Sequence, residues 1–463
     1  MASFLTKLAR LPPMGGAPVA PAEPAPPVAA APAKPSLDDL RDRIARIMAK
    51  APAPAPRAMP AAGELPFLVE HTEHGPLYVR RERAVPAARV GRAPLVAARD
   101  ADPAMIALLA LDPALEGCDP RRALYVDTET TGLAGGTGTV PFLLGLAWLD
   151  GDSFVSEQCL LRRLGEEAPI LDLFARRVAS ASMLVTYNGK AFDLPLLRAR
   201  YVMNRMPPPR EPPHLDLVHL ARRIHKARLK ARTLVAVEAE VLGHARVGDV
   251  SGGEIVATYA HFLRTGDEEA LLGVVEHNAM DVLAMVALVG LYGEPLGRGD
   301  PEEESYAPAA LDGADLAGVA RTLHKAGALD RAAALADEAV SRGGGAHARK
   351  ARGEIAKARG DKARALADYE ALAAEVDDPA VRLELAKLYE HHVRAFGEAL
   401  AVLEKGTGEG LVAETRRRER LAKKLTKAAA PPPEPKPKRR KKARTAILPG
   451  MDEAASPKKV EGA

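Results

Sequence analysis

The chain is 463 residues long, with 47% hydrophobic and only 4% aromatic residues. This length accommodates two or three domains with a sizeable core. The two cysteines, Cys118 and Cys159, lie far apart, which argues against a disulfide-built secreted domain or a cysteine zinc site and favours a cytoplasmic location.

The net charge of +4 is unevenly distributed. Seven cations lie between residues 436 and 444, so the rest of the chain sums to −3. Attraction for nucleic acid must therefore come from local patches, from this tail, or from metal ions held by carboxylates. No apolar run approaches the ~20 residues that cross a bilayer, so no membrane partner is expected.

Residues 1–64 are predicted to form a disordered arm with one short helix, because residues 12–62 contain 13 of the 39 prolines, mixed with alanine. Residues 65–120 contain a short strand near Leu77 and a short helix from Pro103 to Leu109. We interpret this segment as an N-terminal elaboration of the next domain.

Residues 121–298 form the most regular block. Ala123 to Asp127 has the apolar run of a buried strand, and residues 142–161 have the pattern of a hairpin that turns at an Asp-Gly pair. Further on, the pattern predicts a strand over 183–187 and helices over 168–181, 193–203 and 269–292. Strands followed by strand–helix alternation predict an α/β fold with a mixed sheet flanked by helices.

Residues 311–425 are rich in alanine and predicted to be helical. Ala365 and Leu366 recur as Ala399 and Leu400, a spacing of ~34 residues that resembles tetratricopeptide-type helical hairpins. Such repeats would offer a groove to a protein partner. Residues 426–463 form a basic tail rich in Pro and Lys, which we predict to be disordered.

Asp127 and Glu129 are two residues apart at the end of the first strand, so both carboxylates point to the same face. Two like charges side by side are costly without a cation between them, and hard oxygen ligands suit Mg²⁺ or Mn²⁺. The small turn that follows, with Thr130, Gly132 and Leu133, would let a substrate backbone approach closely.

Two later segments supply further candidates. Asp193 can provide a third carboxylate where a strand opens into a helix, although a helix N-cap also explains it. His277 and Asp281 lie one turn apart on one helix face, although a histidine supporting the core also fits. Candidate substrate contacts beside Asp193 are Asn188, Lys190 and Phe192.

The order of these motifs resembles the DEDD-type 3′→5′ exonucleases, the DnaQ-like group of the ribonuclease-H-like fold. The resemblance is closer to YprB-like ribonuclease-H-like proteins and covers about residues 65–295. It rests on five further runs, which are Gly135–Thr139, Phe142–Gly145, Tyr187–Asp193, Val237–Gly243 and His277–Val282.

The resemblance implies a two-metal mechanism of phosphodiester hydrolysis. It makes Asp127, Glu129, Asp193 and Asp281 the ligands of two divalent ions, Mg²⁺ or Mn²⁺, and gives His277 the task of orienting or deprotonating the water. His277 lies four residues before Asp281, where classical members have Tyr; their His lies five before. The expected substrate is a single-stranded end of DNA or RNA. The alternatives are a catalytically weak or inactive nucleic-acid-binding protein and a repeat-based scaffold.

Overall fold

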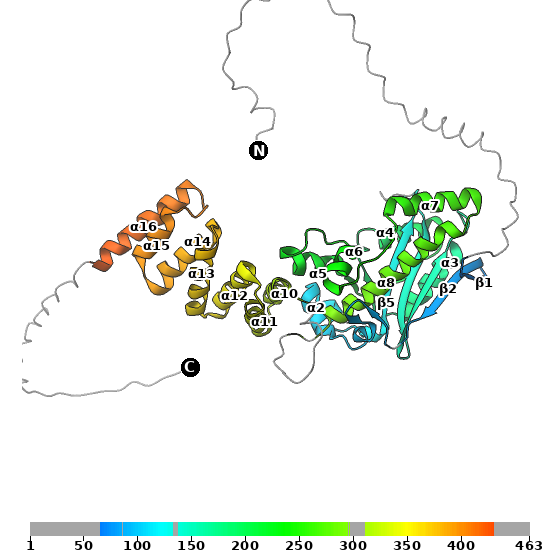
Figure 1. Cartoon of the computed structure of the whole chain (residues 1–463), viewed down its shortest axis with the longest axis horizontal. Helices are drawn as coiled ribbons and strands as arrows, with labels where there is room; N and C mark the ends of the chain where they lie inside the picture. The colour runs from blue at the N-terminus through cyan, green and yellow to red at the C-terminus, as the bar shows by residue number, and fades with distance from the viewer. Residues whose placement is uncertain (1–64, 86, 133–137, 295, 297–310, 430–463) are drawn as a thin grey trace, which may run out of the picture. The chain divides into compact units, whose positions relative to one another are not determined.

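The computed structural model describes residues 65–85, 87–132, 138–294, 296 and 311–429 (Figure 1). The arm predicted over residues 1–64 and residues 430–463 of the predicted tail lie outside the described residues. The described part contains a sheet with flanking helices, followed by a run of helices.

The central sheet has seven strands in the order β1-β2-β7-β6-β5-β8-β9. β5 lies inside it, antiparallel to β6 and parallel to β8, so the predicted mixed sheet is confirmed. Its strands are β1 (Leu68–Thr72), β2 (Gly75–Arg83), β5 (Ala123–Thr130), β6 (Pro141–Asp150), β7 (Ser153–Leu160), β8 (Met183–Thr186) and β9 (His214–Asp216). A separate two-stranded pair consists of β3 (Arg89–Val90) and β4 (Ala93–Pro94).

The segment before residue 121 contributes directly to this sheet. β2 pairs antiparallel with β7, and β1 forms the edge next to β2. The strand near Leu77 was predicted, whereas β1 was not. β1 has a mostly exposed, polar sequence and lacks the apolar alternation that marks a half-buried strand.

Side chains that alternate along β5 face two different helical layers. Ala123 and Tyr125 pack in one apolar cluster with the second half of α8, whereas Leu124 and Val126 pack in another cluster with residues of α3 and α4. The helices of this part are α2 (Pro103–Ala110), α3 (Ala168–Ser180), α4 (Asp193–Met203), α5 (Leu217–Ile224), α6 (Leu234–Val237), α7 (Gly252–Thr265) and α8 (Leu272–Tyr292). Single helical turns occur at Leu95–Ala98, Pro113–Leu115, Pro120–Arg122, His225–Ala227, Glu238–Leu242, Glu269–Leu271 and, further on, Tyr389–Val393.

The long helix α8 runs against β5, β6 and β7 (Figure 1). Together with the turn before it, Glu269–Tyr292 is long and apolar enough to cross a membrane by length and composition, contrary to the expectation from the sequence. Its residues from Val282 to Tyr292 are mostly buried. Since its apolar surface is covered by the sheet, this helix has the burial of a core helix.

The second part of the chain is helical, as predicted. Each helix contacts the next one along the chain. Ala365 in α13 and Ala399 in α15, which occupy equivalent positions of the ~34-residue spacing, are both fully buried. The tetratricopeptide-like assignment stays a prediction. The helices are α10 (Gly313–Lys325), α11 (Leu329–Ser341), α12 (Gly345–Arg359), α13 (Lys362–Glu375), α14 (Pro379–Leu388), α15 (Phe396–Glu404) and α16 (Leu411–Ala429).

Candidate active site

The alternation along β5 places Asp127 and Glu129 on the α8 side of the sheet. Asn278 of α8 donates a hydrogen bond from Nδ2 to Asp127 Oδ2, at 2.8 Å. Thr128 leaves the strand on the other face, where its hydroxyl donates to Asp193 Oδ1 at the start of α4. The end of β5 is therefore the place where acidic groups from both helical layers meet.

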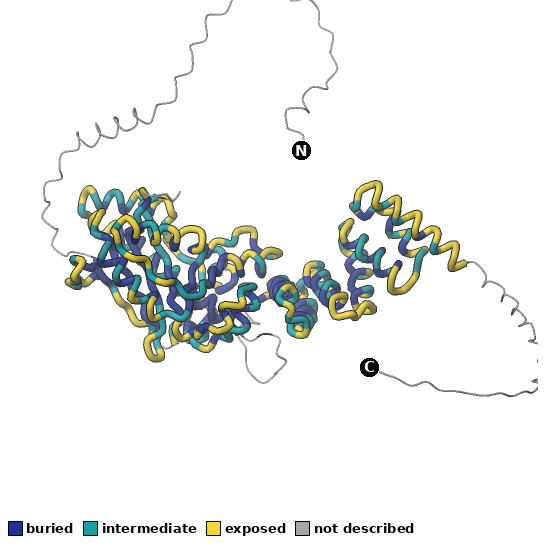
Figure 2. The backbone as a smooth tube through the Cα atoms, turned by 180° about the vertical axis from the view of Figure 1, so that it is seen from behind, coloured by how far each residue is buried: buried dark blue, intermediate teal, exposed yellow. Residues whose placement is uncertain are grey.

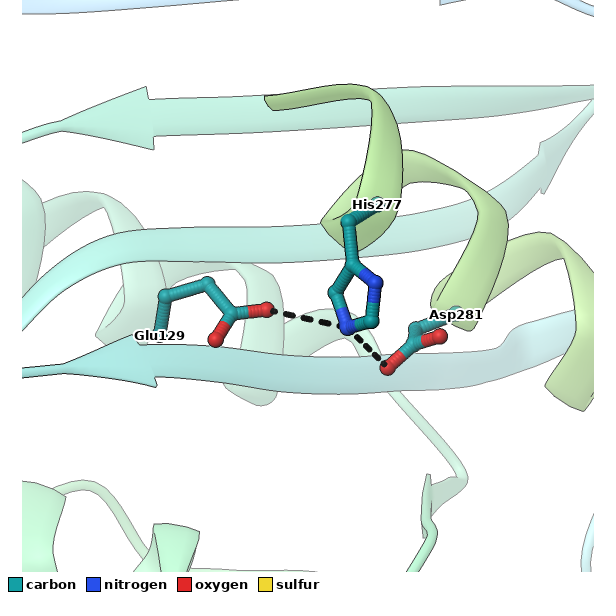
Figure 3. Close-up of side chains that lie close together, drawn as sticks. All are labelled: Glu129, His277 and Asp281. Atoms are coloured by element: carbon teal, nitrogen blue, oxygen red, sulfur yellow. Dashed lines mark ion pairs between the residues drawn. The ribbon is translucent and has the colours of Figure 1, made fainter. Parts of the chain in front are cut away.

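His277 and Asp281 approach the same place from α8 (Figure 3). His277 Nε2 lies 3.9 Å from Glu129 Oε1 and 3.6 Å from Asp281 Oδ2. One ligand atom from each of these three residues lies within 4.8 Å of the other two. The helical spacing of four residues thus gives the shared face that the sequence predicted.

Burial raises the pKa values of all four carboxylates, and neighbouring negative charges add to the effect. Burial raises the pKa of Asp127 well above its usual range, and the charges of Asp281, Glu129 and Asp193 raise it further. Burial is also the main reason that the pKa of Glu129 rises to about 7 and that of Asp193 to about 6. A buried cluster of this kind is costly to ionise unless a cation shares it. Its oxygen donors fit a hard divalent ion such as Mg²⁺ or Mn²⁺.

A cation of the protein itself, Arg246, also lies at this cluster. Its Nη2 donates to Asp281 Oδ1 at 2.5 Å and lies 2.6 Å from Glu238 Oε2. Burial raises the pKa of Asp281, and Arg246 lowers it. Asp249, three residues after Arg246, places Oδ1 2.6 Å from His277 Nδ1. Neither residue was predicted, because a loop without periodicity gives no signal for such contacts.

Gln158 of β7 holds the other end of the Asn278 side chain. Gln158 Nε2 donates to Asn278 Oδ1 at 3.0 Å and to the carbonyl oxygen of Val275 at 2.7 Å. Asn278 can lie this close to the sheet because residue 145 of β6 is a glycine. A Cβ at Gly145 would lie 2.2 Å from Asn278 Oδ1 and 2.7 Å from its Cγ.

Gly145→Ala should therefore destabilise the protein by about 2–3 kcal/mol, because Asn278 is fixed by its hydrogen bonds and has no room to move away. Urea unfolding measures this difference. Gly253→Ala is the matched control, since a Cβ there meets no atom within 4 Å. Equal stabilities of the two variants would refute the tight fit.

The predicted substrate contacts have different surroundings. Thr130 Oγ1 donates to the carbonyl oxygen of Gly132 at 2.9 Å, so this hydroxyl stabilises the turn. Phe192 is 53% exposed and is the N-cap residue of α4, so the N-cap role considered for Asp193 does not apply. Lys190 is exposed. Leu133 lies outside the described residues.

Asn188 has a left-handed backbone, with φ of 70°. Asp216 stabilises this turn, because its carboxylate accepts hydrogen bonds from the backbone N–H of Asn188 at 2.6 Å and of Lys190 at 3.0 Å. No role was predicted for Asp216. The turn sets the direction in which the chain enters α4, and therefore the place of Asp193.

Six cations that could grip phosphates, or form a solvated helix face, lie close together in the sequence, and part of them is used within the protein. They are Arg222, Arg223, Lys226, Arg228, Lys230 and Arg232. Arg223 Nη2 donates to the carbonyl oxygen of Leu109, and Arg228 pairs with Asp315. Arg232 donates to the carbonyl oxygens of neighbouring residues. Half of these cations thus stabilise the fold.

Comparison with known proteins agrees with this geometry. Residues 124–292 match the sequence model of the RNase_H superfamily, and they span the acidic cluster and His277. They form an RNase_H superfamily domain. The uncharacterized protein YprB of Bacillus subtilis (strain 168) is 40% identical over 175 residues. The matched region covers 37% of this chain and 42% of YprB, so the likeness spans less than half of either protein.

Proposed function

We propose that this domain is a metal-dependent nuclease that hydrolyses phosphodiester bonds of DNA or RNA, acting as a 3′→5′ exonuclease on a single-stranded end. The observation that carries the proposal is the cluster of Glu129, His277 and Asp281 in an RNase_H superfamily domain, with Asp127 and Asp193 near enough for their charges to interact with it. The repulsion between the carboxylates disfavours the ionised cluster unless divalent cations bind there.

Asp127, Glu129, Asp193 and Asp281 would hold two divalent ions, Mg²⁺ or Mn²⁺. When bound, such ions supply the positive charge that activates a water and stabilises the leaving oxygen. The protein prepares these ligands. Asn278 fixes one oxygen of Asp127 and Thr128 fixes one of Asp193, which leaves the other carboxylate oxygens available.

His277 would take the proton of the attacking water. Nδ1 lies 2.6 Å from Oδ1 of Asp249 and 3.3 Å from Nη1 of Arg246. The nearer carboxylate favours a proton on Nδ1, which would leave Nε2, facing Glu129 and Asp281, free to accept. Asp249 is therefore a positioning residue that sets the orientation and tautomer of His277.

Asp249→Asn should lower kcat by about 10- to 100-fold and leave the Mn²⁺ affinity and the melting temperature nearly unchanged. The reason is that the imidazole loses its fixed tautomer while the carboxylate ligands stay in place. Asp267→Asn is the matched control, since Asp267 pairs with His261 at 3.1 Å on the surface. Steady-state kinetics across Mn²⁺ concentrations decides the matter, and equal kcat values for both variants would reject this role.

The proposed activity is tested by incubating the full chain with Mn²⁺ and matched single- and double-stranded DNA and RNA, labelled at either end. The expected result is release of mononucleotides from the 3′ end of single strands, which stops in EDTA. A second candidate, a catalytically weak nucleic-acid-binding protein, is favoured by the guanidinium of Arg246 on Asp281. Binding of the strands without any metal-dependent cleavage would support that candidate and reject the nuclease.

A further inference from the structure

The last described helix, α16, carries a row of cations along one side. Arg416, Arg420, Lys423 and Lys427 are spaced by four, three and four residues, which places them on one face over roughly 16 Å of helix. All four are exposed. Together with Glu419 and Lys424 they border a shallow hollow of about 350 Å³. We call this row the α16 basic face.

Contacts of Leu421 and contacts at the edge of the basic face fix α16 to the neighbouring helices. Leu421 is fully buried in a small apolar cluster with Ala386, Ala399 and Leu403. The carboxylate of Glu390 accepts hydrogen bonds from Arg420 and Lys424. These contacts set the rotation of α16 about its axis, so the basic face is held outward.

Three cations of the α16 basic face form no ion pair within the described part of the protein. Among the described residues, no carboxylate or carbonyl partner is found for Arg416, Lys423 or Lys427. The neighbouring Arg417 and Arg418, by contrast, are engaged by Glu409 and Glu414. Figure 2 shows most of α16 as exposed. Three of the four cations of the face are therefore free positive charges, and the fourth, Arg420, is held by Glu390.

We propose that the α16 basic face binds the phosphate backbone of nucleic acid, without reading its sequence. The inference rests on the proposed function for the choice of ligand. A row of cations matches a chain of regularly spaced phosphates, and lysine and arginine are the residues that neutralise them. A membrane would need the apolar side of α16, and Leu421 on that side is already covered by α14 and α15.

Binding here would hold the substrate at a second point, away from the acidic cluster. The carboxylates around Asp127 repel phosphates unless divalent ions are bound, so they cannot supply this affinity alone. The α16 basic face should therefore affect affinity and the salt dependence of KM, and it should leave kcat unchanged.

The test is the binding of a fluorescein-labelled single-stranded oligonucleotide to the full chain in EDTA, followed by anisotropy between about 50 and 200 mM salt. The variant is Arg416→Gln/Lys423→Gln/Lys427→Gln. The matched control is Lys325→Gln/Lys362→Gln/Lys405→Gln, which removes the same charge from exposed positions of α10, α13 and the end of α15. Both variants keep the basic tail, so their difference reports on α16.

We expect the slope of log affinity against log salt to fall by about 2 in the α16 variant, since each phosphate contact on a single strand contributes about 0.7. The control should keep the wild-type slope. Equal slopes in the two variants would overturn the proposal. It would also be overturned if the α16 variant bound the oligonucleotide like the wild type and instead lost binding to anionic phospholipid vesicles. The binding assay in EDTA is independent of the cleavage assay in Mn²⁺. If no Mn²⁺-dependent cleavage occurs, the proposed nuclease activity is rejected, but the salt slopes still test the binding proposal.

Discussion

Asp127→Asn is expected to abolish metal-dependent hydrolysis, by on the order of a thousandfold or more, and at the same time to make the metal-free protein more stable. The two effects have one cause. Asp127 is buried and its pKa is raised by burial and by three neighbouring carboxylates, so its ionisation costs free energy that only a bound cation recovers. Asparagine keeps an oxygen that can accept the hydrogen bond from Asn278 and removes the charge.

The gain in the free energy of unfolding should be about 1–3 kcal/mol near pH 8 in EDTA. Urea unfolding measures it, and a nuclease assay in Mn²⁺ measures the loss of activity. Asp172→Asn is the control, because Asp172 forms an ordinary surface pair with Arg176. If Asp127 only stabilised the end of β5, its substitution would destabilise the protein, and that sign would contradict the metal-site account.

The carboxylate cluster should also make the metal-free protein less stable as the pH rises from about 4 to about 7, measured relative to the double variant Glu129→Gln/Asp193→Asn. That comparison cancels groups with the opposite trend, such as His214, whose pKa burial lowers to about 4. The pKa of Glu129 is raised from 4.5 to about 7 and that of Asp193 from 3.8 to about 6, so in this window the folded state keeps protons that the unfolded chain has released. Rising pH therefore lowers the free energy of unfolding, by on the order of 3 kcal/mol for each group. Asp127, whose pKa is also raised, adds to the same trend.

Mn²⁺ should reverse this trend, because it binds the ionised carboxylates and competes with protons. The increase in melting temperature on adding Mn²⁺ is expected to be small at pH 5 and large at pH 8. The double variant Glu129→Gln/Asp193→Asn should show a weaker pH trend and a smaller Mn²⁺ effect, because it keeps Asp127 and Asp281 but lacks the other two carboxylates. A metal-free wild-type protein that loses no stability relative to the double variant between pH 4 and 7 would contradict the account.

Local patterns were sufficient to predict most elements around the site. The apolar run before Asp127 and the Asp-Gly turn after Leu149 predicted β5, β6 and β7, with Gly151 in the left-handed conformation that the turn needs. The spacing of two along β5 and of four along α8 predicted which acidic groups share a face. Residue spacings within one strand or helix are visible in the sequence, so these relations could be predicted from it.

Contacts between elements could not be predicted in this way. The place of Asn278 depends on Gly145, more than a hundred residues earlier, and the orientation of His277 depends on Asp249 in a loop. In the sequence, Arg246 cannot be distinguished from other charged loop residues; its pairing with Asp281 is seen only in the folded structure. Such pairings depend on how β6, α8 and the loop before α7 pack, and no local periodicity encodes that.

The central claim is that Asp127, Glu129, Asp193 and Asp281 share divalent cations. The most direct test is an anomalous difference map from a crystal of the full chain grown with Mn²⁺. The account predicts peaks whose ligands include oxygens of Asp127 and of at least two of the other three carboxylates. Absence of any peak within coordination distance of Asp127, in crystals where Mn²⁺ is seen elsewhere, would contradict it.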